Sequence, residues 1–174
     1  MKAYKFLREG GVSPFTATCW PLPKEGKPGE WVEAHGVEMC RRGVHACTIE
    51  DLPYWFQDEL WEVELAGDMQ RVGHKVAAAR GRLVRRVDGW NPDCARAFSF
   101  DCADRAAAIA AGTPEAAAHA ADAVRAAEAG NAAVSGFIVA RSAELSGGVR
   151  AYDAERATQV EWLVRRLELT ATSD

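Results

Sequence analysis

The 174-residue sequence contains no apolar run of the roughly 18–20 residues that a membrane-spanning helix requires. No glycine-rich segment has the spacing of a phosphate cradle or a dinucleotide fingerprint, and no C-x2-C motif of the zinc-knuckle kind is present. A strong excess of one charge is also missing, because the net charge is −4. These absences argue against a membrane protein and against general attraction to nucleic acid or acidic membranes.

Cysteines are few, odd in number and irregularly spaced: Cys19, Cys40, Cys47, Cys94 and Cys102. Such a set is not typical of a disulfide framework and favours free thiols in a reducing compartment. The first residues, MKAYKFLREGG, lack the apolar core and the small-residue cleavage site of a signal peptide. We therefore expect a soluble, cytoplasmic protein.

The composition changes near Trp90. Five of the six tryptophans and most of the prolines lie at or before this residue, whereas alanine dominates after it. This change predicts an α+β fold, with a small, mostly antiparallel N-terminal sheet packed against a C-terminal layer of about four helices. We expect a β-rich part with one short helix over residues 1–90 and a helical part over residues 91–174, together forming one compact domain.

The first part is predicted to contain five extended segments: 3–9, 30–34, 43–47, 59–65 and 75–87, the last bent at Gly81. Segment 59–65 alternates most clearly, because Trp61, Val63 and Leu65 would share one face. Thr48 followed by Asp51 predicts the start of a short helix into LPYWF.

Four helices are predicted in the second part from their start and stop signals. Asn91-Pro92 opens a helix that runs to about Ala111, and Thr113-Pro114 opens a second that ends before Gly130. A third extends from about Ala132 to Leu145. Asp153 is expected to open the fourth, in which apolar residues recur at helical spacing.

The stretch RRGVHACTIEDLPYWF, residues 41–56, and the preceding Cys40 contain the one close group of thiols and an imidazole. Cys40, His45 and Cys47 supply up to three zinc ligands, which Cys94 or Cys102 could complete. A thiolate nucleophile activated by nearby arginines or His45 is an alternative. Buried free thiols in a β core are the simplest interpretation, and we assign no metal site.

A basic run extends from Arg71 to Arg86 and includes His74 and Lys75, with no acidic residue in between. Arg80, Arg82 and Arg86 would share a face of a regular strand, where arginine forks match the oxygens of a phosphate or pyrophosphate. The alternative is a solvated strand face that balances the acidic remainder of the chain.

Glu62 and Glu64 would lie on one face of the strand over residues 59–65. Paired carboxylates can perform acid–base chemistry or orient a ribose hydroxyl. The alternative is that both carboxylates lie on the solvent-exposed face of a half-buried strand.

The order of AYKFLRE, then GVHACT, a short helix and LWEVEL resembles that of small, uncharacterised bacterial and phage proteins with a Gly-x-His-x-[Ser/Cys] strand motif. More remotely it is similar to the front half of ADP-ribosyltransferase-like folds. The resemblance covers about residues 3–66 and implies an NAD- or nucleotide-binding enzyme. It implies catalytic roles for His45, Glu62 and Glu64, and cofactor binding by Tyr4, Arg8, Thr48, Arg80, Arg82 and Arg86.

Two other classes compete with this hypothesis. One is a protein stabilised by metal on Cys40, His45 and Cys47. The other is a non-catalytic module that binds a ligand or a protein through Trp20, Trp31 and Trp55, which should then be exposed and contiguous. In each case the expected partner is not a membrane or a nucleic acid, and a small-molecule or nucleotide ligand is the leading candidate.

Overall fold

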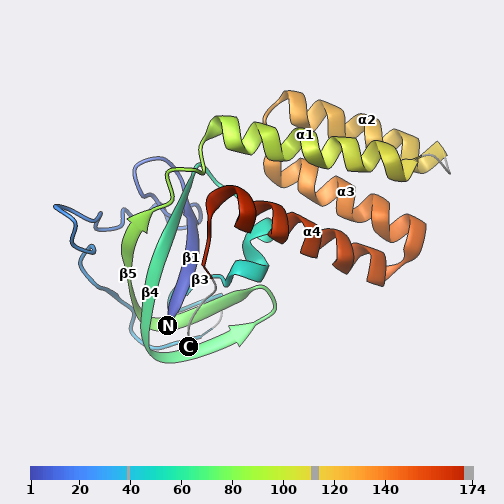
Figure 1. Cartoon of the computed structure of the whole chain (residues 1–174). Helices are drawn as coiled ribbons and strands as arrows, with labels where there is room; N and C mark the ends of the chain where they lie inside the picture. Colours follow the sequence, from blue (N-terminus) through green and yellow to red (C-terminus); the bar gives the residue numbers. More distant parts are fainter. Residues whose placement is uncertain (39, 111–113, 171–174) are drawn as a thin grey trace. The chain divides into compact units, whose positions relative to one another are not determined.

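The computed structural model describes residues 1–38, 40–110 and 114–170, and it confirms the α+β class (Figure 1). The chain divides into two compact units. Among the described residues, the sheet unit contains Met1–Trp90 with Leu169 and Thr170, and the helical unit lies within Asn91–Glu168. In the described residues, no helix is long and apolar enough to cross a membrane.

In its described residues, the sheet unit contains five strands and one short helix in the predicted order. The elements are β1 (Lys2–Leu7), β2 (Val32–Glu33), β3 (Val44–Ala46), the 3-10 helix η1 (Ile49–Tyr54), β4 (Glu59–Val72) and β5 (Lys75–Arg86). All pairings are antiparallel. The largest difference from the prediction is β4, which continues from Leu65 to Val72 through an irregularity at Ala66/Met69. The extra length makes β4 and β5 one long hairpin.

The sheet curls until its pairing returns to the first strand. β4 lies between β1 and β5, and β3 pairs with β5. Tyr4 of β1 and Cys47, directly after β3, then exchange two backbone hydrogen bonds of 2.8 Å. Figure 1 shows the β4–β5 hairpin curving around β1. This bridge pairs the backbone of Tyr4 on the edge of β1, which would otherwise present an unpaired amide and carbonyl there.

Apolar side chains from alternate strand positions form the core of this curled sheet. The core includes Ala3, Leu7, Trp20, Val44, Ala46, Trp61, Val63, Leu65, Val76, Ala78 and Leu83. Gly81 lies in this tight space: a Cβ there would stand 2.7 Å from Cγ1 of Val44 and 3.0 Å from Cδ2 of Leu65. The absence of a side chain at Gly81 therefore lets β3 and β4 approach β5.

A second apolar group lies on the other side of β1. The Phe6 ring centroid is 5.4 Å from those of Phe56 and Trp90, and the last two rings are stacked 5.0 Å apart. Because Phe56 lies two residues after the end of η1, this aromatic cluster fixes η1 against β1. The position of η1 matters, since it carries the acidic residue of the candidate site.

The helical unit contains α1 (Pro92–Ile109), α2 (Pro114–Glu128), α3 (Ala132–Gly147) and α4 (Val149–Leu167). Asn91 caps α1 as predicted, its side-chain oxygen accepting a bond from the Cys94 amide. The predicted end of the first helix at Ala111 and the start signal Thr113 lie outside the described residues. α4 starts at Val149 rather than at Asp153, because Gly148 at φ +73° turns the chain between α3 and α4 within one residue.

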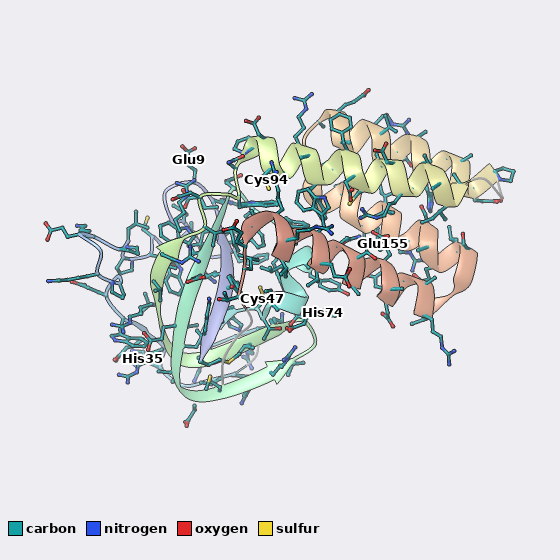
Figure 2. All side chains as sticks on the ribbon, in the orientation of Figure 1. Glu9, His35, Cys47, His74, Cys94 and Glu155 are labelled. Atoms are coloured by element: carbon teal, nitrogen blue, oxygen red, sulfur yellow. The ribbon has the colours of Figure 1, made fainter. Side chains whose placement is uncertain are left out.

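Polar side chains occupy part of the interior of this helical unit. Arg105 of α1 donates to both oxygens of Glu155 of α4, at 2.8–3.2 Å. The Gln159 amide donates to Glu155 at 2.9 Å and to the Gly136 carbonyl of α3 at 2.9 Å. Figure 2 labels Glu155 among the helices. This network ties α1, α3 and α4 together through one buried carboxylate.

Candidate functional site

A buried carboxylate and a half-exposed imidazole meet where η1 approaches the turn of the β4–β5 hairpin. Oδ1 of Asp51 lies 3.0 Å from Nδ1 of His74. Asp51 is 5% exposed, whereas the His74 side chain is 50% exposed. Figure 2 labels His74 at this end of the hairpin. A carboxylate on Nδ1 fixes the ring and directs Nε2 away from the carboxylate.

The start of η1 sets the position of Asp51. Thr48 precedes the helix as predicted, but its hydroxyl does not bond a backbone amide. Instead, Oγ1 of Thr48 donates to Oδ2 of Asp51 at 2.9 Å, and the Asp51 amide donates to the Thr48 carbonyl at 3.2 Å. Both residues are buried, so the carboxylate has a fixed orientation with one oxygen directed to His74.

Arg71, near the end of β4, completes the charged group. Its Nη2 donates to Oγ1 of Thr48 at 3.2 Å and to Oδ2 of Asp51 at 3.3 Å. The Arg71 side chain is 56% exposed, and Nη2 is the atom that makes both of these bonds. It can therefore hold an anionic ligand next to His74, because a guanidinium presents five donors in a rigid fork.

Aromatic residues of η1 and its end hold the His74 ring in place. The imidazole stacks on the ring of Tyr54, with centroids 3.6 Å apart and planes 8° from parallel. Nε1 of Trp55 donates to the His74 carbonyl at 2.6 Å. Within the described residues, Nε2 of His74 has no hydrogen-bond partner. An oriented imidazole with an accessible Nε2 can take a proton from, or give one to, a bound molecule.

Next to His74 in the chain, Lys75 connects the site to the loop before β3. Its ammonium lies 5.5 Å above the Trp55 ring and donates to Sγ of Cys40 at 2.8 Å. The backbone amide of Cys40 in turn donates to Nε2 of His45 at 3.2 Å. Of the predicted group Cys40, His45 and Cys47, the structure joins His45 to Cys40, through the backbone amide of Cys40 rather than its thiol.

His45 is surrounded by groups that favour its neutral form. Burial lowers the pKa of the imidazole, the ammonium groups of Lys5 and Lys75 lower it further, and a backbone hydrogen bond to Gly43 opposes them. The neutral ring accepts the Cys40 amide proton and supports the loop. His45 lies on β3, where its backbone pairs with Ala77.

Cys47 takes no part in this group. Its buried thiol donates to the Tyr4 carbonyl at 3.4 Å, and burial raises the pKa of the thiol far above its usual value. Over the described residues, no set of three or more Cys, His, Asp and Glu side chains is arranged to hold a metal ion. The zinc arrangement of Cys40, His45 and Cys47 therefore has no geometric support.

Glu62 and Glu64 project from the same strand, but each is paired with β5. Arg85 makes a two-point contact with Glu62, at 2.6 and 2.9 Å, and Lys2 bonds it at 2.9 Å. Burial acts to raise the pKa of Glu62, but the bonds from Lys2 and Arg85 outweigh it and hold the pKa below its usual value. Arg82 binds Glu64 at 2.6 Å. These carboxylates are therefore already engaged in cross-strand ion pairs.

The predicted cofactor-binding residues are distributed over different contacts. Arg80 and Arg82 both lie over the Trp31 ring, at 4.8 and 4.6 Å from its centroid. Arg86 bonds buried Glu59 at 3.2 Å. Arg8 is exposed and pairs through its backbone with Val12.

Tyr4 is buried, and its hydroxyl donates to the Thr170 carbonyl at 2.9 Å. Of the nine residues predicted for catalysis or cofactor binding, Thr48 lies in direct contact with the Asp51–His74 pair, through its bond to the Asp51 carboxylate.

The three tryptophans expected on a recognition surface differ in exposure. Trp20 is buried in the core of the sheet, at 7% exposed. Trp31 and Trp55 are partly buried, and each carries a cationic side chain over its ring. A contiguous apolar face made of these three rings is therefore not formed.

Sequence reasoning missed Asp51, Arg71 and His74 as a group. His74 was assigned to a basic run and Asp51 to a helix start. The two residues are 23 positions apart in the chain, so no local pattern linked them. The one available signal was a histidine placed between Gly73 and Lys75 at a hairpin turn. Its partner became identifiable only when η1 was placed beside the turn.

Comparisons of the chain with protein-family models, with curated proteins and with solved structures found no match. The function is therefore argued from the site alone.

Proposed function

We propose that the sheet unit is a small enzyme that uses His74 as a general base or acid on a bound anionic molecule. The observation that carries the proposal is the contact between the buried carboxylate of Asp51 and Nδ1 of His74, at 3.0 Å. A buried carboxylate in this position orients the imidazole and stabilises its protonated form during proton transfer. Nε2 would then remove a proton from a water or hydroxyl nucleophile, as in hydrolysis or group transfer.

The charges and rings around His74 favour a nucleotide as the ligand class. Arg71 and Lys75 lie on either side of His74 in the chain and match phosphate oxygens. Tyr54 and Trp55 add aromatic surface next to these cations. NAD is included in this class, in keeping with the resemblance of the first strands to ADP-ribosyltransferase-like folds. In this proposal Asp51 and His74, rather than the ion-paired Glu62 and Glu64, perform the proton transfer.

Ligand binding is tested first, by saturation-transfer NMR with NAD, ATP and GTP at millimolar concentration. We expect at least one of them to bind the wild type and to bind Arg71→Gln less well. Absence of binding by all three would remove the nucleotide proposal. Saturation at equal ligand concentrations in wild type and Arg71→Gln would remove the assignment of the site.

Catalysis is tested on the nucleotide that binds, by following its conversion with proton and phosphorus NMR. We expect His74→Gln and Asp51→Asn to slow turnover by about 10²–10⁴-fold, the usual contribution of a general acid or base. His35→Gln is the matched control, because His35 is exposed in the turn after β2. Circular dichroism of each variant separates loss of chemistry from loss of fold. A folded His74→Gln protein with wild-type turnover would contradict the proposal.

A further inference from the structure

An exposed thiol and an amine are held in contact on the surface of the sheet unit. Nζ of Lys75 lies 2.8 Å from Sγ of Cys40. Cys40 belongs to the loop between β2 and β3, and Lys75 is the first residue of β5. The two groups are 35 positions apart in the chain, so their contact is a product of the fold.

The backbone holds Cys40 in position. The residue has φ +65°, a left-handed conformation that non-glycine residues adopt infrequently. Its amide donates to Nε2 of His45 at 3.2 Å, and the turn is closed by backbone bonds between Glu38 and Arg42 of 2.8 and 2.9 Å. The backbone conformation of the loop therefore sets the position of the Cys40 side chain.

Lys75 is also held in place. Its backbone is paired with Val72 at the turn of the β4–β5 hairpin, and its ammonium lies 5.5 Å above the Trp55 ring. The side chain is partly buried, which limits the positions that Nζ can reach.

Cys19 provides an internal comparison. It is the other exposed cysteine, whereas Cys47, Cys94 and Cys102 are buried. In the part of the chain that the structure describes, the thiol of Cys19 makes no contact with an amine. A reaction that needs an adjacent amine should therefore occur at Cys40 and not at Cys19.

We propose that Cys40 and Lys75 form a reversible, oxidation-dependent crosslink between the β2–β3 loop and β5. Hydrogen peroxide oxidises the Cys40 thiol to a sulfenic acid and is itself reduced to water. Nζ of Lys75 then loses a proton to solvent and attacks the sulfur, forming an S–N bond as the sulfenic oxygen leaves in a second water. The pair loses two hydrogens in total, and the two electrons pass from sulfur to peroxide. A thiol reductant cleaves the S–N bond and restores both side chains.

This inference does not depend on the proposed function. The crosslink would involve Lys75, the residue that follows the catalytic candidate His74 in the chain, but its formation requires only the geometry of Cys40 and Lys75. If no nucleotide binds, the crosslink proposal is unaffected. If no crosslink forms, the proposed enzymatic function is unaffected.

The test is a peptide mass map of the full chain after treatment with a few equivalents of hydrogen peroxide. In the wild type we expect a crosslinked peptide that joins Cys40 to Lys75, about 2 Da lighter than the sum of its parts and lost after treatment with dithiothreitol. Trypsin should also fail to cut after Lys75. The crosslinked wild type should unfold at a temperature higher by roughly 5 °C or more, because the bond closes a loop of the unfolded chain.

Three variants distinguish this bond from other oxidation products. Cys19→Ser should keep the crosslink, which excludes a disulfide between exposed thiols. Lys75→Gln should lose it, and Cys40 should instead gain about 32 Da as a sulfinic acid. Cys40→Ser should show neither product. The proposal is overturned if wild type and Lys75→Gln yield the same sulfinic acid at the same rate and no Cys40–Lys75 peptide appears.

Discussion

The two units of this protein use a buried carboxylate in opposite ways. In the sheet unit, Asp51 is buried but its partners His74 and Arg71 are half exposed. In the helical unit, Glu155 bonds Arg105 and Gln159, and Gln159 is fully buried. In the first arrangement, the partners of the carboxylate are accessible to solvent. In the second, the carboxylate and its partners bond to one another inside the helical unit. The comparison indicates that accessibility of the partners, rather than burial of the acid, distinguishes a candidate site from a structural network.

The largest effect is expected from removing the carboxylate of the helical network. Glu155→Ala leaves the guanidinium of Arg105 without its main buried partner, which should lower the free energy of unfolding by about 3 kcal/mol. Urea denaturation followed by circular dichroism at 222 nm measures this loss. Glu155→Gln keeps the shape and one acceptor, so it should lose less. Equal stability of Glu155→Ala and wild type would show that the network does not hold the helices together.

A smaller loss is expected from overfilling the core of the sheet. Gly81→Val places a branched side chain where a Cβ alone would lie 2.7 Å from Val44, which should lower the free energy of unfolding by about 2 kcal/mol. Tryptophan fluorescence during urea denaturation reports on this unit, which contains five of the six tryptophans. Met69→Val is the control, because Met69 is exposed on β4 and the change should stay within about 0.5 kcal/mol. If Gly81→Val is as stable as this control, the core of the sheet accommodates the larger side chain at little cost in the free energy of unfolding.

A pH-dependent effect is expected from Lys5 of β1. Burial lowers the pKa of its ammonium to about 8, and Nζ donates to the His45 carbonyl at 2.6 Å. Since the unfolded chain binds this proton up to a higher pH, the free energy of unfolding should rise between about pH 8 and 10.5, by at most about 1.4 kcal/mol per pH unit.

Lys5→Met removes this proton-binding group. The stability of the wild type relative to Lys5→Met should therefore be constant below pH 7 and should increase above pH 8, as measured by urea titrations at several pH values. A difference that stays flat from pH 7 to 10 would mean that the ammonium is not buried in solution.

The smallest effect concerns thiol access and involves no change in stability. Under reducing, native conditions, we expect Ellman's reagent to label Cys19 and Cys40 quickly, because both are exposed. Burial raises the pKa of Cys47 and Cys102, so these thiols should react only as the protein unfolds. Rapid labelling of more than two thiols per chain would contradict the closed core of either unit.

Much of the fold could be predicted from the sequence, because its elements are defined by local signals. The alternation of Trp61, Val63 and Leu65 located a strand, and the Asn91-Pro92 pair located the start of α1. The length of β4 was underestimated, since its second half has no buried residue after Leu65 to mark a face. The start of α4 was misplaced because a single glycine, Gly148, sufficed to turn the chain.

The candidate site was less predictable, because it depends on contacts between distant residues. Glu62 and Glu64 were correctly placed on one strand, but the sequence did not show that Arg85 and Arg82 would neutralise them from β5. The register of the hairpin decides those pairs. His45 was grouped with the thiols of Cys40 and Cys47, whereas in the structure it bonds the backbone amide of Cys40.

The sequence by itself determined the division into a sheet-forming and a helix-forming part, because composition and periodicity act over a few neighbouring residues. It also set which faces of the strands are apolar. Only the tertiary structure decided which polar groups meet. Closure of the sheet at Tyr4 and Cys47 and the turn of the β4–β5 hairpin brought Asp51 to His74 and Cys40 to Lys75. These contacts join residues 23 and 35 positions apart, and no local pattern specifies such pairs.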